Sequence, residues 1–476
     1  MKPDVLQTFS SLDALQRARY LLDADSFSPL TDTSEAVSLL AGAGAVGGRP
    51  VWIALMDGHV RGGTIGLREA GILARLAEQV MAARQQRRRP VLILAFDTGG
   101  VRVEEGPIAL AAASAVGVAL ARLTLLGVRV VGIVSGPRGC FGAPSVMAAL
   151  PERVIVTAPA HWGLTGPKLL GDILDGAVPG ADALAATSAE SRLANGDAHC
   201  VVADEADAVR AALFKFVVSG ARRPRLHGLD ARIVASAERT AKLCARLKRA
   251  EPAMADIPVR GRRRDLLRYS FRGQWKPSGP IQRTGLIHAA IGTLAQQPAL
   301  GLIVGPEQIR GGVGIEEAAV VTDMVRQLAE QPDAVRAPIL TFLFCQGHAV
   351  DYAQERFGLP SALAECLRAL VAARLLGHPI ISVLGGGTYG AAYLALAAPS
   401  HRILAMRGTS VAPMAPRVLR AFQQLRGQKP GYEPGTQLAQ LIPDIRIVDS
   451  VIRLPRVLRE ELTSLVETVR PDVHAA

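Results

Sequence analysis

Cysteine and histidine are too few and too scattered in this sequence to build a disulfide framework or a metal site. The five cysteines have no paired short spacing. The nine histidines form neither an H-E-x-x-H motif nor a cluster at ligand spacing. We therefore expect reduced thiols in the cytoplasm and no bound metal.

A membrane-spanning run is missing as well. The first 27 residues contain no continuous apolar stretch after the basic start, so neither a signal peptide nor a membrane anchor is expected. Residues 379–400 carry no charge, but glycines and polar residues interrupt them. This stretch predicts a buried strand and helix rather than a contact with a membrane.

Aromatic residues and negative charge are in short supply. Phe, Trp and Tyr make up 4% of the 476 residues, which leaves few stacking platforms for nucleic acid. Lysine and arginine number 54 against 42 acidic residues, a net charge of +12. Part of the excess lies in RQQRRRP (84–90) and RGRRRD (260–265). Such a balance favours an acidic partner, although solvated linker arginines explain it equally well.

Nucleotide-binding and nucleophile motifs are absent or incomplete. There is no G-x-x-x-x-G-K-[ST] and no G-x-S-x-G. GGGTYG (385–390) fits G-x-G-x-x-G between a strand and a helix, but the next strand has no acidic residue for a ribose. Glu104 and Glu105 could act as acid or base, or could simply favour the start of a helix. The sequence thus points away from these common chemistries.

An internal repeat is the most informative feature that is present. LLGVRVVGIVSGPRGCFGAPSVMAALPERVIVTA (125–158) resembles LLGHPIISVLGGGTYGAAYLALAAPSHRILAM (375–406). PVLILAFDTGGV (90–101) likewise resembles PILTFLFCQGHAV (338–350). Each copy predicts a strand, a loop, a helix, a second strand, a glycine-rich bend, a short helix and a third strand. We expect mainly parallel α/β pairing, with Gly142 and Ala143 matching Ala391 and Ala392 after a one-residue deletion.

The repeat implies two homologous domains, because a spacing of about 250 residues is far too long for a solenoid. We expect one domain over 1–220 and the other over 280–476. An Arg-rich linker over 221–279 should separate them, with a helix at 230–252.

The glycine-rich bends suggest chemistry done by backbone amides. Glycine lets a backbone approach a ligand closely, and the first N–H groups of a helix have no internal partner. Such N–H groups can hold a thioester oxygen as it takes on negative charge. Two copies of the bend would provide two oxyanion holes.

The first half resembles the β-type carboxyltransferase-like subunit of biotin-independent malonate decarboxylase. The resemblance rests on GGTIGLREAG (62–71), FDTGGVRVEEG (96–106), GCFGAPSVMAA (139–149) and WGLTGPKLL (162–170), in that order. The start, LDALQRARYLLDADSF, is also similar. One departure is Lys168, where the family usually has an acidic residue.

The second half resembles the γ-type subunit of the same enzymes. LRALVAARLLGHPIISVLGG (367–386) and YGAAYLA (389–395) carry the similarity. The loop CQGHAVDY (345–352) departs from the family's Gly-Gln-Ala-Tyr-like stretch. Together the halves resemble fused β-type and γ-type subunits of the crotonase-like superfamily.

The resemblance implies a fold, a reaction and a partner. The implied fold is α/β, two tandem crotonase-like ββα-superhelical domains facing a shared active site, paired within one chain or across a homodimer. The implied reaction is decarboxylation of a malonyl thioester to the acetyl thioester and CO2. The substrate would be carried on the phosphopantetheine arm of an acyl carrier protein, with other decarboxylase subunits as partners and no tightly bound cofactor.

The resemblance also assigns residues. Gly142 and Ala143 would form one oxyanion hole, and Ala391 and Ala392 the other. Residues that would shape the substrate cleft are Gly99, Gly100, Gly139, Gly166, Tyr389 and Gly390. Two alternatives stay open, a biotin-dependent acyl-CoA carboxyltransferase and a non-catalytic assembly subunit, with nucleic-acid binding a distant further one.

Overall fold

The chain folds into two compact units in a computed structural model. The first comprises Met1–Arg102, Ala115–Arg225 and Glu355–Ser361, and the second Val103–Ser114, Leu226–Gln354 and Ala362–Ala476. The structure describes residues 8–31, 37–174, 180–218, 228–251, 275–278, 282–284, 287–294, 297–305, 312–331, 337–345, 347–426, 445–448 and 453–469. RGRRRD (260–265), most of the expected linker and Gln346 lie outside the described residues.

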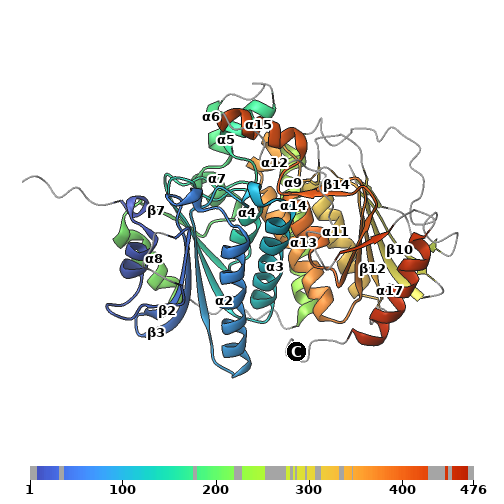
Figure 1. Ribbon diagram of the computed structural model, residues 1–476, viewed down its shortest axis with the longest axis horizontal. Helices are drawn as coiled ribbons and strands as arrows, with labels where there is room; N and C mark the ends of the chain where they lie inside the picture. Colours follow the sequence, from blue (N-terminus) through green and yellow to red (C-terminus); the bar gives the residue numbers. More distant parts are fainter. Residues whose placement is uncertain are drawn as a thin grey trace, which may run out of the picture. The chain divides into compact units, whose positions relative to one another are not determined.

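A seven-stranded sheet in the order β1-β2-β3-β4-β5-β6-β7 forms the centre of the first unit (Figure 1). β2 and β3 form an antiparallel hairpin, and every pair from β3 to β7 is parallel. The strands are β1 (Ser28–Pro29), β2 (Leu39–Val46), β3 (Arg49–Met56), β4 (Val91–Phe96), β5 (Arg129–Val134), β6 (Arg153–Thr157) and β7 (Cys200–Val202).

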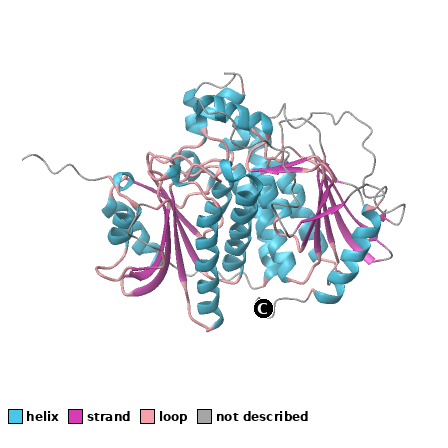
Figure 2. Cartoon of the chain, viewed as in Figure 1, coloured by secondary structure: helices cyan, strands magenta, loops and turns pink. Residues whose placement is uncertain are grey.

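Helices cover both faces of this sheet (Figures 1 and 2). α1 (Ala14–Leu21) and α8 (Ala206–Val217) bury apolar side chains in one core with β2 to β6. α2 (Leu67–Gln85) lies on the other face, and it begins where the Glu69 carboxylate accepts the Gly66 N–H at 2.9 Å. The remaining helices are α3 (Gly106–Leu125), α4 (Ala143–Ala148), α5 (Pro167–Ile173), α6 (Gly180–Ala186) and α7 (Ala189–Asn195).

The second unit is built on an eight-stranded sheet. Its order is β17-β15-β13-β12-β11-β10-β8, with β9 also paired to β10. β10 and β11 form an antiparallel hairpin, whereas β11 to β17 pair in parallel. The strands are β8 (Trp275–Pro277), β9 (Gln282–Thr284), β10 (Ile287–Leu294), β11 (Gln297–Val304), β12 (Ile339–Leu343), β13 (Ile380–Leu384), β15 (Arg402–Met406) and β17 (Ile445–Val448).

The second sheet is also flanked by helices (Figure 2). α17 (Leu454–Thr468) buries its leucines against β12, β13 and β15. α11 (Ile315–Ala329) packs on α9 (Leu229–Ala250), which is the helix expected at 230–252. Other elements are α12 (Tyr352–Arg356), α13 (Leu359–Leu375), α14 (Gly390–Ala392), α15 (Pro416–Arg426) and a small parallel pair, β14 (Gly387–Tyr389) and β16 (Ser410–Ala412).

The two units repeat the same order of elements. An antiparallel hairpin, a helix, a parallel strand, a long helix, another parallel strand, a bend and a short helix occur in both. Gly314 begins α11 as Gly66 begins α2, with the Gly314 N–H donating to Glu317 at 2.8 Å. The expected fold, two tandem crotonase-like α/β domains, is confirmed. The boundaries 1–220, 221–279 and 280–476 stay a prediction.

One described helix, Val103–Leu125, is long and apolar enough to span a membrane, and most of its side chains are buried, as in a core helix. All five cysteines are free thiols.

Leu213 in α8 is expected to contribute strongly to the stability of the first unit, because its side chain is fully buried in the core with α1. Leu213→Ala should lower the free energy of unfolding by about 2–5 kcal/mol in urea denaturation. Lys215→Ala on the exposed side of the same helix is the matched control. Equal effects of the two substitutions would contradict the assigned packing.

Candidate active site

The bend after β5 is held as a short extended segment between two neighbouring loops. The Thr98 N–H donates to the Gly139 carbonyl at 2.8 Å, and the Phe141 N–H donates to Thr98 O at 3.1 Å. On the other side, the Cys140 N–H donates to His161 O at 2.9 Å. The bend therefore lies at the carboxyl ends of the parallel strands, where open α/β sheets bind their ligands.

Gly142 turns the chain from this segment into α4. Its φ is +65° and its ψ −150°, a conformation that only glycine adopts readily. Its N–H is already used, because it donates to Leu164 O at 3.0 Å. The Ala143 N–H is the first of α4, and no hydrogen bond among the described residues uses it. The assignment of Gly142 and Ala143 as oxyanion donors stays a prediction; of the two, Gly142 supplies the turn and Ala143 has the N–H that no described residue uses.

The other glycines expected to shape the cleft differ in their surroundings. A Cβ on Gly139 would lie 2.1 Å from His161 O, so a side chain there is excluded. Cβ atoms on Gly99 and Gly100 would only make ordinary contacts, with a backbone oxygen at 3.5 Å in each case. Gly166 precedes α5 and has open space around it. Close approach thus explains glycine at position 139 but not at position 166.

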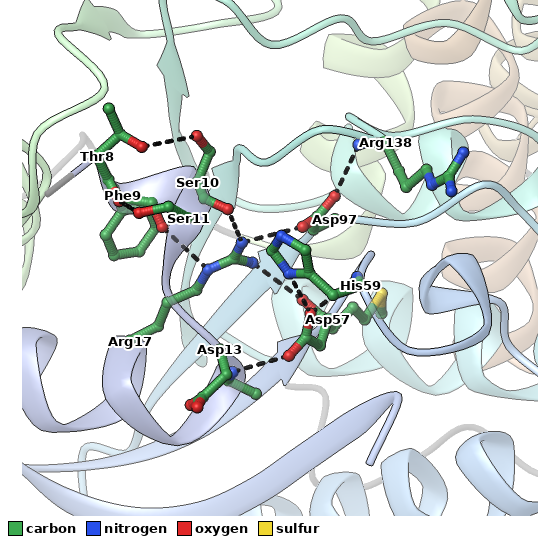
Figure 3. A network of polar contacts seen from close by, with 12 residues as sticks. Thr8, Phe9, Ser10, Ser11, Asp13, Arg17, Asp57, His59, Asp97 and Arg138 are labelled. Carbon is green, nitrogen blue, oxygen red and sulfur yellow. Dashed lines mark hydrogen bonds and ion pairs between the residues drawn. The ribbon is translucent and has the colours of Figure 1, made fainter. Parts of the chain in front are cut away.

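A buried ion pair supports the bend from below (Figure 3). Arg17 Nη2 lies 3.0 Å from Asp97 Oδ2, and both side chains are fully buried. Asp97 follows β4, and its Oδ1 accepts the Arg138 N–H in the bend at 3.0 Å. A Cβ on Gly136 would overlap Asp97 Oδ2 at 2.0 Å. Burial raises the pKa of Asp97, and the Arg17 guanidinium opposes that shift.

Asp57, His59 and Asp97 offer ligand atoms within 4.8 Å of one another (Figure 3). Asp57 Oδ1 lies 2.8 Å from His59 Nδ1, and Asp57 Oδ2 accepts the Ala14 N–H at 3.0 Å. The Arg17 guanidinium stands beside the third member of this group. Its fixed positive charge would repel a cation, so the cluster does not favour a metal.

The bend of the second unit has a corrected alignment to the first. Gly390 has a φ of +51° and lies nine residues before Pro399, as Gly142 lies nine before Pro151. Gly390 is therefore the counterpart of Gly142, and Ala391 that of Ala143. The expected one-residue deletion agrees with the flanking strands, because Val131 and Arg153 correspond to Ile381 and Arg402. Within the bend, however, the left-handed glycine lies one residue earlier than expected. Ala391 and Ala392 are buried at the start of α14, where N–H groups have no internal partner.

His348 lies next to the second bend. His348 Nδ1 would lie 3.8 Å from a Cβ placed on Gly390. His348 is half-buried, and desolvation lowers its pKa to about 4 and leaves the imidazole neutral at pH 7. Tyr389 is almost fully buried, and its ring lies over Gly387. Sequence reasoning missed His348, Asp97 and Arg17; an aspartate directly after a buried strand was the one visible signal.

Comparisons with known proteins agree with the two-unit geometry. Residues 10–236 match the carboxyl transferase domain family, and residues 309–424 match the malonate decarboxylase gamma subunit family. The chain is 28% identical over 149 residues to the malonyl-S-ACP:biotin-protein carboxyltransferase MADC of Malonomonas rubra, covering 28% of this chain and 44% of that protein.

Two further similarities concern a curated relative and a solved structure. The acetyl-coenzyme A carboxylase carboxyl transferase subunit beta of Desulforamulus reducens is 29% identical, covering 34% of this chain and 53% of that protein. The chain thus spans about half the length of the curated relatives it matches. A chain of the Pseudomonas malonate decarboxylase MdcD–MdcE hetero-dimer is 32% identical with a TM-score of 0.42, covering 47% of this chain and 94% of that one.

These matches define a chain with a carboxyl transferase domain in its first half and a gamma-subunit domain in its second half. One polypeptide thus joins a half that matches the carboxyl transferase domain family to a half that matches the malonate decarboxylase gamma subunit family. The resemblance predicted from the sequence is confirmed.

Gly136 and Gly127 allow a matched test of the support under the first bend. Both have positive φ and flank β5, but only Gly136 faces Asp97. Gly127→Ala should cost about 1–2 kcal/mol of unfolding free energy from backbone strain. Gly136→Ala should cost at least about 1–3 kcal/mol more, because the methyl group overlaps the Asp97 carboxylate. Equal urea midpoints for the two variants would refute the close approach.

His348 should make stability depend on pH. The unfolded chain binds a proton near pH 6.5, but the folded chain does so only near pH 4. The stabilisation is therefore complete above pH 6.5 and is lost as the pH falls toward 4, by up to about 3 kcal/mol. Urea unfolding at pH 7 and pH 4 should show a smaller difference for His348→Gln than for the unchanged protein. A pH-independent offset between the two would rule this out.

Proposed function

We propose that the chain decarboxylates a malonyl thioester on an acyl carrier protein, giving the acetyl thioester and CO2. The observation that carries the proposal is the pair of bends, each with a positive-φ glycine at the start of a helix, as N-cap of α4 in the first unit and as first residue of α14 in the second. The match of residues 309–424 to the malonate decarboxylase gamma subunit family supports malonyl as the acyl group. A reducing cytoplasm is the proposed compartment, since all five cysteines are free thiols.

The reaction creates negative charge on the thioester oxygen. The bond between the malonyl Cα and its carboxylate breaks, CO2 leaves, and the electron pair remains as an enolate. A proton from solvent then adds to that carbon and completes the acetyl group. The Ala143 N–H is the proposed donor to the enolate oxygen, because its neighbour Gly142 is fixed on Leu164 O. By the corrected alignment, Ala391 is the proposed donor of the second bend, with Ala392 following it.

The carrier protein and other decarboxylase subunits are the proposed partners. The MADC relative carries malonyl-S-ACP in its name, and acidic partners suit a net charge of +12. Arg49 is the first residue of β3, and Arg129 is the first residue of β5. Burial lowers the pKa of Arg49, and repulsion from Arg129 and Arg89 lowers it further. This basic cluster lies at the strand ends opposite the first bend. It therefore suits a partner subunit better than delivery of the thioester.

Carboxyl transfer to a biotinylated protein is the second candidate, because the same relative is named a biotin-protein carboxyltransferase. The two reactions differ in the fate of the carboxylate. Avidin should leave CO2 release from malonyl-carrier unchanged if biotin takes no part. Loss of turnover in avidin, restored by excess free biotin-protein, would favour the second candidate.

Ala143→Pro deletes the proposed donor with little damage to the helix, since proline is favoured at the first helical position. We expect kcat for CO2 release to fall by about 10²–10³-fold with little change in thermal unfolding. Ala391→Pro should have a similar effect if the second bend also contributes. Ala206→Pro at the start of α8, where the preceding residue is extended, is the matched control and should remain active.

The assay is release of labelled CO2 from malonyl-carrier, with malonyl-CoA in parallel. Turnover that survives Ala143→Pro unchanged would eliminate the amide mechanism. Binding of the carrier without any CO2 release by the folded protein would instead identify an assembly subunit.

A further inference from the structure

A short segment from the second half of the chain is part of the first unit. Glu355–Ser361 belongs to this unit, although it lies within the gamma-subunit match. The buried Arg192 side chain donates to the backbone carbonyl of Glu355, and Asn195 Nδ2 donates to Arg356 O at 2.6 Å. At the other end, Ser361 Oγ donates to the Asp197 carboxylate. The segment is therefore fixed by directional bonds along its length.

The Glu355 side chain is fully buried and binds a backbone loop of the first half. Its Oε2 accepts the Leu164 N–H at 3.0 Å, and its Oε1 accepts the Thr165 N–H at 2.6 Å. A Cβ on Gly163 would lie 2.9 Å from Oε2, so glycine permits this approach. Two consecutive N–H groups thus receive one carboxylate, an arrangement typical of a charge-assisted interaction.

The bound loop is the one that holds the first bend. Leu164 donates its N–H to Glu355 and accepts the Gly142 N–H on its carbonyl at 3.0 Å. Gly142 in turn directly precedes the N–H of Ala143. We propose that Glu355 is a positioning residue for the first oxyanion donor, acting through Leu164 and Gly142. This inference rests on the proposed function for its rate effect, but not for its structural effect.

The buried negative charge of the Glu355 carboxylate is stabilised by the groups around it. Burial raises the pKa of this carboxyl, while the Leu164 and Thr165 N–H groups and the Arg192 guanidinium favour its ionised form. A neutral amide cannot replace it, because Gln offers one oxygen to two N–H groups and turns an NH2 toward the other. The loop around Leu164 would then shift to relieve a buried, unpaired donor.

A small shift of the loop should affect the transition state more than substrate binding. An oxyanion donor acts on charge that appears only as the bond breaks, so its misplacement lowers kcat and leaves KM nearly unchanged. Displacements of about 1 Å can cost up to about 10²-fold in rate. A purely structural role for Glu355 would instead lower the amount of folded protein and leave its kcat intact.

The test compares Glu355→Gln with Ser361→Ala in the full chain. Ser361→Ala loosens the same segment at Asp197 without touching Leu164. For CO2 release from malonyl-carrier, we expect Glu355→Gln to lower kcat about 10- to 100-fold with KM within about twofold. Ser361→Ala should keep kcat within about twofold, since the Leu164 bonds remain.

A second readout needs no substrate. Hydrogen exchange of the peptide covering residues 139–150 should accelerate at least about tenfold in Glu355→Gln but not in Ser361→Ala, because the Gly142 N–H loses its fixed acceptor. Wild-type exchange and kcat in a folded Glu355→Gln would overturn the inference, as would equal losses of kcat in both variants. If the unchanged protein releases no CO2, the proposed function fails, and the exchange data still decide the positioning role.

Discussion

The hydrogen bond from the Gly142 N–H to Leu164 O, made at a left-handed glycine, is the constraint on which the first bend depends. Any other residue at Gly142 would be strained by the positive φ, and without that φ the chain could not pass from the extended bend directly into α4. Because this bond uses the Gly142 N–H, the next N–H, that of Ala143 at the start of α4, is the one left for a ligand. A local backbone choice therefore decides where a developing negative charge could be held.

This bend is supported from two sides by buried carboxylates with different partners. Asp97 lies beneath it, paired with Arg17 from the N-terminal helix and bonded to the Arg138 N–H. Glu355 lies behind it and acts on Leu164. Burying either charge is costly unless every oxygen finds a donor. The Asp97 oxygens accept from the Arg17 guanidinium and the Arg138 N–H, and the Glu355 oxygens accept the Leu164 and Thr165 N–H groups. Such fully bonded charges restrict the loops to one arrangement, which is what an oxyanion site requires.

The sequence alone revealed the repeat, the parallel strands and the family, because these depend on periodic apolar segments and on local glycine motifs. It placed Ala391 and Ala392 opposite Gly142 and Ala143, whereas the positive φ of Gly390 places the turn of the second bend one residue earlier. It could not reveal the pairing of Glu355 with Leu164, which are 191 residues apart in the chain. Arg17 was equally hidden, because arginine by itself is an ordinary surface residue, whereas Asp97 was visible only as an aspartate directly after a buried strand.

The two bends have a similar backbone conformation, but different side chains pack against them. The Ser135 N–H bonds to Phe96 O in the first unit as the Gly385 N–H bonds to Leu343 O in the second. Asp97 is therefore matched by Phe344, whose ring would overlap a Cβ on Gly385. By the same alignment, His348 takes the place of Val101. An ion pair supports one bend and an aromatic ring the other, while a left-handed glycine at the start of the helix is retained in both. What the repeat preserves is thus the left-handed glycine and the helix start that follows from it, whereas the side chains around each bend differ.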